Sequence, residues 1–132
     1  ARRVRLAVRK DRHLTPAAGD PRSLERALTV LVDNAVKFSP NGGDVEISLT
    51  SRADQVLVLV KDEGIGIPSE IRARIFDRFF HVEKNGDHLF GGLGLGLSIA
   101  RQVIQQHKGT LTVESVVGRG STFRIALPVW RR

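Results

Sequence analysis

The chain has no cysteine, few aromatic side chains and no long apolar run. Without cysteine it can form neither a disulfide framework nor a thiolate metal site. Its four histidines, at positions 13, 81, 88 and 107, show no spacing typical of a zinc site. No segment approaches the ~20 apolar residues that span a membrane, and no signal-peptide pattern is present. We therefore expect a soluble, cytoplasmic domain.

The length and composition indicate a single globular domain that spans residues 1–132. A chain of 132 residues with 41% hydrophobic residues can bury a core of its own. The net charge is +7, and basic residues gather near the amino terminus. No aromatic side chains are interleaved with these basic residues, so nucleic-acid binding is not expected. A solvated basic face, or a polyanionic small ligand, is compatible with the charge.

The first half of the chain alternates between strand and helix patterns. Residues 4–8 alternate as an edge strand does. Asp20 is a candidate N-cap and Pro21 suits the first helical position. Apolar residues then recur with helical spacing at Leu24, Leu28, Leu31, Ala35 and Phe38. Residues 45–50 and 55–61 read as two strands.

The second half predicts further helices and a hairpin. Residues 68–80 have a short helical rhythm, residues 81–90 have no period, and a helix follows to about His107. Residues 110–116 and 121–127 form a hairpin whose inward positions are Leu111, Val113, Phe123, Ile125 and Leu127. Hairpin-joined strands interrupted by helices predict an α+β fold in two layers.

The most informative stretch is residues 91–100, where four glycines in six residues lead into a helix pattern. Glycine loses much conformational freedom on ordering, so such a cluster suits a sharp bend or a closely approaching ligand. In front of a helix it offers unpaired N–H groups to an anion, usually phosphate. A flexible linker is the alternative, but linkers are rich in Ser and polar residues, whereas these spacers are leucines.

Two other stretches carry polar groups where they are costly. Asp62 ends a strand that is apolar on both faces, and two glycines follow within four residues. A buried carboxylate is unfavourable unless it accepts hydrogen bonds. On the first helix, Asn34 and Lys37 lie three residues apart and are therefore neighbours. A surface turn at Asp62 and a solvent-facing Asn34 are the plainer readings of these stretches.

Five stretches in order resemble the N, G1, F, G2 and G3 boxes of the ATP-binding domain of sensor histidine kinases. They are residues 34–38 (Asn-Ala-Val-Lys-Phe), 62–67 (Asp-Glu-Gly-Ile-Gly-Ile), Phe76 with Phe79-Phe80, 92–97 (Gly-Leu-Gly-Leu-Gly-Leu) and 118–123 (Gly-Arg-Gly-Ser-Thr-Phe). The wider superfamily includes gyrase, Hsp90 and MutL. The resemblance implies the Bergerat ATP-binding fold, a mixed and mostly antiparallel sheet with about three helices on one face.

The resemblance also implies the site. Asp62 would accept from the adenine amino group, Asn34 would bind Mg²⁺, and Lys37 would neutralise phosphate charge. Residues 81–91 would form a lid, and Thr122 would line the adenine end. The residues it assigns to ATP are Asn34, Lys37, Phe38, Asp62, Gly64, Gly66, Ile67, Phe79, His81, Gly92, Leu93, Gly94, Leu95, Gly96, Leu97 and Thr122.

Three positions depart from the family pattern. Val30 stands where many histidine kinases carry a second Asn and gyrase-like proteins a Glu that activates water. His81 stands where kinases often have an Arg near the γ-phosphate, and Leu93 replaces a small or hydroxyl residue. We still expect nucleotide binding, with weaker binding or slower turnover.

The implied function is to donate the γ-phosphoryl group of Mg-ATP to a histidine on another segment. No residue of this chain is expected to be the phosphoacceptor, because no histidine lies in a suitable helix. The chain is then a monomeric fragment of a homodimeric membrane sensor kinase that lacks its dimerisation domain and serves a response regulator. An anti-sigma-factor-type serine kinase and a degenerate nucleotide-binding module are the alternatives.

Overall fold

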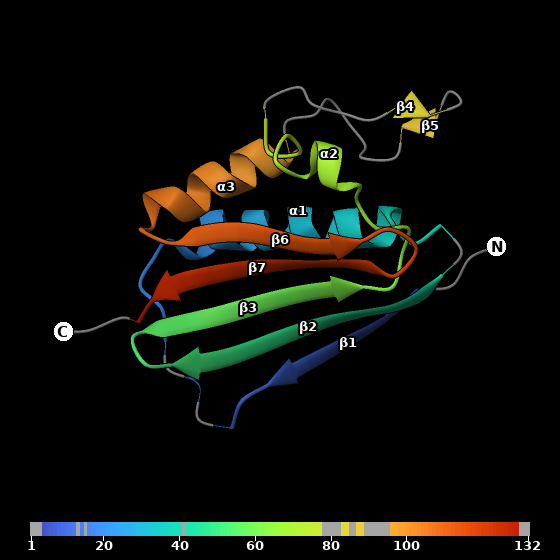
Figure 1. Ribbon diagram of the computed structural model, residues 1–132. Coiled ribbons are helices and arrows are strands. Elements are labelled where there is room, and N and C mark those ends of the chain that lie inside the picture. Colours follow the sequence, from blue (N-terminus) through green and yellow to red (C-terminus); the bar gives the residue numbers. More distant parts are fainter. Residues whose placement is uncertain are drawn as a thin grey trace.

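The computed structural model describes residues 4–12, 14, 16–40, 42–77, 83–84, 87–88 and 96–129 of the chain. Its main feature is a five-stranded sheet in the order β1 (Val4–Lys10), β2 (Gly43–Arg52), β3 (Gln55–Asp62), β7 (Gly120–Pro128) and β6 (Thr110–Val116). β1 is parallel to β2, and the other neighbours are antiparallel. The helices lie on one face of this sheet (Figure 1), so the predicted two-layer α+β fold is confirmed.

The two longer helices are tied together at one end. α1 (Pro21–Lys37) begins at Asp20, whose carboxylate accepts from the Ser23 backbone N at 3.3 Å. The Asp20 backbone N in turn donates to His107 Nε2 at 2.9 Å, just beyond α3 (Gly96–Gln106). The predicted N-cap is thus confirmed, and the start of α1 is fixed against the end of α3.

The core lies between the helices and every second residue of the central strands. Val56, Val58 and Val60 of β3 are buried, and Asp62 continues the same row. Their partners on β7 form a matching row that consists of Leu127, Ile125, Phe123 and Ser121. Because strand side chains alternate between the two faces, this row brings the Asp62 carboxylate to the end of the buried face.

Two short elements complete the described part of the chain. α2 (Ser69–Arg72) is shorter than the helical rhythm of residues 68–80 predicted. Within the segment predicted to have no regular structure, β4 (Glu83–Lys84) pairs with β5 (Asp87–His88), so that prediction is wrong for these four residues. None of the helices that the structure describes has the length and apolar character to cross a membrane.

Candidate functional site

Asp62 is a buried carboxylate at the end of β3. Only 1% of the surface of this residue is exposed. Its Oδ1 accepts hydrogen bonds from Gly64 N at 2.8 Å and from Ser121 N at 3.2 Å. Its Oδ2 is buried and has no hydrogen-bond partner among the described residues. Burial raises the pKa of Asp62, while the two backbone N–H groups act in the opposite direction. A buried acceptor without a donor is costly, so Oδ2 marks a place where a donor can bind.

The loop after β3 is packed tightly against the protein's own backbone. A Cβ at Gly64 would overlap the carbonyl of Phe38, and one at Gly66, where φ is +77°, would overlap the carbonyl of Val116. Ile65 N also donates to Phe38 O at 2.9 Å. The resemblance assigns these two glycines to the ATP site, and the structure shows that protein atoms occupy the space where a Cβ of either residue would lie. The glycines therefore allow the loop to close against α1 and the β6–β7 hairpin.

Two buried serines connect this loop to Asp62. Ile67 N donates to Ser115 Oγ at 2.6 Å, and Ser115 Oγ donates to Gly120 O at 3.0 Å. The Ser115 and Ser121 hydroxyl oxygens lie 2.8 Å apart. Sequence reasoning missed both serines as site residues. The two-residue period of β7 was the available signal, since a strand that turns Phe123 inward also turns Ser121 inward.

The structure does not bring Thr122 to the buried face. Thr122 pairs with Lys61 of β3 and with Glu114 of β6, one register position away from the Asp62–Ser121 pair. Successive side chains of a strand point to opposite faces. Thr122, expected to line the adenine end, thus lies on the other face of β7, and Ser121 is the residue of this stretch that lies opposite Asp62.

Helix α1 places Asn34 between the loop and the start of α3. Phe38, one turn after Asn34, accepts the hydrogen bond from Ile65 N. Val30, one turn before it, lies against Gly96, where an added Cβ would be 3.3 Å from Val30 Cγ1. Asn34 itself is buried, and Lys37 on the same helix is exposed. Asn34 thus lies on α1 one turn from the Phe38 contact with the Asp62 loop and one turn from the Val30 contact with the first residue of α3.

The remaining predicted residues fall into two groups. Phe38, Ile67 and Leu97 belong to the hydrophobic core, and the Phe38 ring centroid is 6.4 Å from that of Phe123. Phe79, His81, Gly92, Leu93, Gly94 and Leu95 lie outside the described residues. The part of the predicted site that the structure describes is therefore Asp62 with the loop after β3, together with the α1 side chains.

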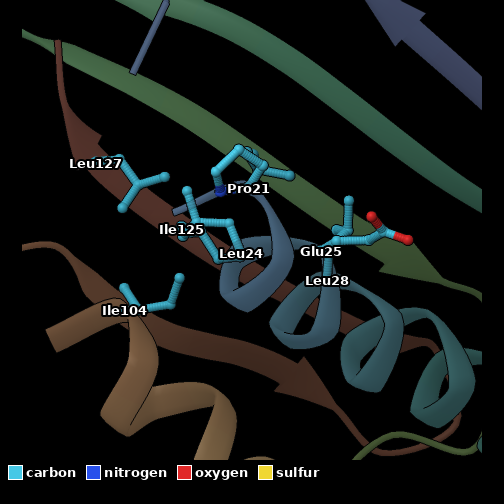
Figure 2. Close-up of a pocket in the computed structure, with 8 residues that line it drawn as sticks. Pro21, Leu24, Glu25, Leu28, Ile104, Ile125 and Leu127 are labelled. Atoms are coloured by element: carbon cyan, nitrogen blue, oxygen red, sulfur yellow. The ribbon is translucent and has the colours of Figure 1, made fainter. Parts of the chain in front are cut away.

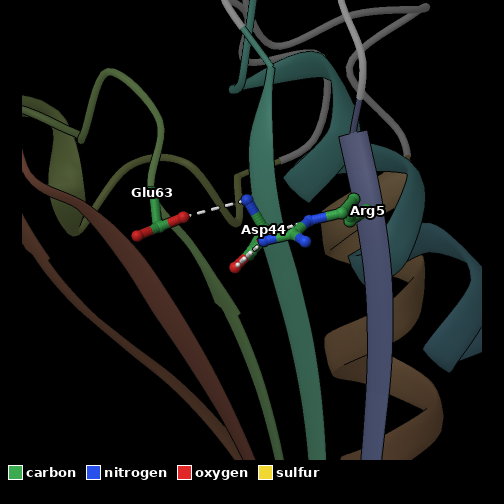
Figure 3. Close-up of polar contacts among 3 residues, drawn as sticks. All are labelled: Arg5, Asp44 and Glu63. Atoms are coloured by element: carbon green, nitrogen blue, oxygen red, sulfur yellow. Dashed lines mark hydrogen bonds and ion pairs between the residues drawn. The ribbon is translucent and has the colours of Figure 1, made fainter.

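Glu63 is directed away from this site, although it follows Asp62 in sequence. Its Oε1 accepts from Asp44 N at 2.9 Å, and the Asp44 carboxylate accepts from Arg5 Nε at 2.8 Å (Figure 3). These contacts join the ends of β1, β2 and β3 on the exposed surface. Of the two consecutive acids, only Asp62 enters the buried face.

A separate cavity of about 260 Å³ lies between the start of α1, the end of α3 and the sheet (Figure 2). Its lining is aliphatic apart from Pro21 and Glu25, and consists otherwise of Leu24, Leu28, Val58, Ile104, Ile125 and Leu127. It offers one carboxylate at its rim and no side-chain amide or hydroxyl. A polyanionic ligand would find no partner there, so the Asp62 region remains the candidate site.

These features define the ATP-binding fold of one family. The chain belongs to the family described as histidine kinase-, DNA gyrase B- and HSP90-like ATPases, which it matches over residues 19–131. Within that family it is a domain of the sensor histidine kinase type, as its similar relatives show.

Among curated relatives, the chain is 41% identical over 114 residues to the sensor histidine kinase RppB of Synechocystis sp., covering 86% of this chain and 25% of RppB. It is 46% identical over 110 residues to the sensor-like histidine kinase SenX3 of Mycobacterium tuberculosis, covering 83% of this chain and 27% of SenX3. The chain thus spans about a quarter of the length of these relatives.

Solved structures give the same family and fold. The mycobacterial sensor histidine kinase MprB is 32% identical with a TM-score of 0.79, over 98% of this chain and 84% of that one. Full-length ShkA in complex with AMPPNP is 28% identical with a TM-score of 0.83, over 98% of this chain and 26% of that one.

Proposed function

We propose that this domain binds Mg-ATP and supplies the γ-phosphoryl group to a histidine on a separate dimerisation domain of a two-component sensor kinase. The observation that carries the proposal is the buried Asp62 Oδ2, which has no partner among the described residues. The exocyclic amino group of adenine is a donor of suitable size for that position. The family description, which names ATPases, supports the same ligand.

The acid at the end of β3 accounts for selection of the purine. Guanine carries a carbonyl oxygen where adenine carries its amino group, so it would set an acceptor against the acceptor of Asp62. A buried hydrogen bond left unmade costs about 1–3 kcal/mol, and more for a charged group. We therefore propose a preference for ATP over GTP of at least ~10-fold.

The phosphate end uses the side chains of α1 and the backbone before α3. Lys37 is exposed on the last turn of α1 and can approach a phosphate. Gly92, Gly94 and Gly96 would offer backbone N–H groups at the start of an eleven-residue helix, where the helix dipole favours an anion. Holding the triphosphate in one orientation is the main contribution a protein makes to phosphoryl transfer.

Magnesium fits the available donors only together with the nucleotide. The described residues contain no group of three or more His, Asp or Glu side chains that could hold a metal. Asn34 supplies one amide oxygen, a hard ligand suited to Mg²⁺, which usually keeps several waters and binds substrate phosphates. When bound, the ion would neutralise phosphate charge, and Asn34 would hold it.

Val30 favours transfer to a separate acceptor over hydrolysis. It lies one turn before Asn34 and contacts the start of α3. An aliphatic side chain there can neither activate water nor bind Mg²⁺. We propose accordingly that the phosphoryl acceptor is a histidine outside this chain, in a homodimeric parent that serves a response regulator and is anchored in the plasma membrane.

The proposal is tested by incubating the chain with labelled ATP, Mg²⁺ and a separately produced dimerisation segment that carries its histidine. Acid-labile label on that segment is the expected result, and an Asp62→Asn chain should give none. Nucleotide binding without any transfer would instead identify a degenerate binding module. Label on serine would point to an anti-sigma-factor-type kinase.

A further inference from the structure

We infer that Ser115 is a positioning residue that fixes the direction of the Ser121 hydroxyl, so that the purine end of the site presents acceptors only. The inference rests on the proposed function, because it requires a purine beside Asp62. Ser115 is on β6 and does not need to touch the nucleotide. It acts through Ser121, which lies directly opposite Asp62 on the neighbouring strand.

The direction of the hydrogen bond between Ser115 and Ser121 follows from the number of protons that each hydroxyl has. A serine hydroxyl has one proton to donate and two lone pairs with which to accept. Ser115 Oγ donates its proton to Gly120 O at 3.0 Å and accepts from Ile67 N at 2.6 Å. Either oxygen of the 2.8 Å contact between Ser115 and Ser121 could donate on geometry alone, and because the one proton of Ser115 is directed to Gly120 O, we assign this hydrogen bond to donation from Ser121.

Burial stabilises this arrangement of the two hydroxyl groups. Ser115 is 9% exposed and Ser121 is 3% exposed, so bulk water has little access to either hydroxyl. The backbone partners of Ser115 are Ile67 N in the loop after β3 and the carbonyl of Gly120, the first residue of β7. Turning the Ser115 hydroxyl would leave one of these buried groups without its partner, which is unfavourable.

The consequence concerns selection at position 6 of the purine. With its proton committed to Ser115, Ser121 Oγ can only accept, as can Asp62 Oδ2. Two acceptors on the same face of the sheet suit a 6-amino group, which donates, and oppose a 6-oxo group, which accepts. If Ser115 is removed, the Ser121 hydroxyl can turn and donate to a 6-oxo purine.

The test compares binding of ADP and IDP, which differ at position 6, to the full chain with Mg²⁺ by calorimetry. We expect Ser115→Ala to lower the ratio of ADP affinity to IDP affinity about fivefold, the worth of one ordinary hydrogen bond. Ser115→Thr, which keeps the hydroxyl, should retain the wild-type ratio. Thr112→Ala removes a hydroxyl from the exposed face of the same strand and should also leave the ratio unchanged.

A double-mutant cycle separates positioning from a general structural effect. In a Ser121→Ala background there is no hydroxyl to turn, so adding Ser115→Ala should not change the ratio further. An equal effect of Ser115→Ala in both backgrounds, or no effect in either, would overturn the inference. If Ser115→Ala does not fold, Ser115→Cys keeps the volume and must still lower the ratio. Failure of the wild-type chain to bind ADP would instead refute the proposed function.

Discussion

Asp62 and Ser121 face each other across β3 and β7, and the Ser121 backbone N–H donates to Asp62 Oδ1 at 3.2 Å. Gly64 N donates to the same oxygen at 2.8 Å. The protein thus satisfies one carboxylate oxygen with its own backbone and leaves Oδ2 buried without a partner in the described structure. This difference in hydrogen bonding between the two oxygens of one carboxylate is the physical basis of the proposed nucleotide site.

Asp62→Asn should weaken nucleotide binding and at the same time stabilise the fold. The amide keeps an oxygen for Gly64 N and Ser121 N but turns the unpaired acceptor into a donor, which opposes the adenine amino group. We expect ADP binding to weaken at least ~100-fold, since a charged hydrogen bond is lost and two donors are opposed. The free energy of unfolding at neutral pH should rise, because an uncompensated buried charge is removed. Calorimetry and urea denaturation measure the two quantities, and a destabilised variant with intact binding would contradict the account.

The free energy of unfolding should depend on pH through the titration of Asp62. Burial raises the pKa of this carboxyl in the folded state above its ordinary value of 3.8. Between that value and the raised pKa the folded state binds more protons than the unfolded state, so stability falls as pH rises through this window. Asp62→Asn lacks this contribution. The stability advantage of Asp62→Asn should therefore grow from acid pH upward and become constant above the raised pKa, as measured by urea denaturation across pH. An advantage that shrinks with rising pH would show the opposite sign of shift.

Removing Mg²⁺ should weaken ATP binding most while Asn34 is present. In the wild-type chain, chelation of Mg²⁺ should weaken ATP binding, because the ion links Asn34 to the phosphates. In Asn34→Ala the gain from Mg²⁺ should fall about tenfold, as a ligand bond to a charged group is worth roughly 1.5–3 kcal/mol. Asp33→Ala alters an exposed neighbour on the same helix and serves as the control. An Mg²⁺ effect of equal size in all three chains would remove Asn34 from the metal site.

Gly64→Ala should destabilise the fold even in the absence of nucleotide. The added Cβ would overlap the Phe38 carbonyl, a backbone atom that cannot move aside easily. We expect a loss of about 3 kcal/mol, the upper part of the usual range for overpacking. Gly118→Ala is the matched comparison, because its φ is +84° but nothing lies within 4 Å of the new Cβ. Its loss should be about 1 kcal/mol from backbone strain alone, and equal losses in thermal or urea unfolding would refute the steric explanation.

Patterns with a short period were sufficient to predict most of the fold. The N-cap at Asp20, the inward row that ends at Asp62 and the final hairpin are local features that depend on neighbours within a few residues. The short β4–β5 ladder was missed, although Asn85-Gly86 between its strands is the dipeptide most typical of a two-residue hairpin loop.

The site was less accessible from sequence because it depends on contacts between distant segments. Ser115 and Ser121 look like ordinary strand residues until β6 and β7 are paired and Ile67 is placed against them. The glycines of the loop were recognised, but the atoms beside them, the Phe38 and Val116 carbonyls, come from other elements. Thr122 and Ser121 differ by one register position, which in a strand reverses the face.

Calorimetry of ADP binding to the folded wild-type chain and to Asp62→Asn, with Mg²⁺ present, decides whether the Asp62 carboxylate binds the base of the nucleotide. We expect saturable binding heat for the wild-type chain and none for Asp62→Asn, with both chains showing cooperative unfolding. Equal binding by the two chains, or no heat from a wild-type chain that is demonstrably folded, would contradict it.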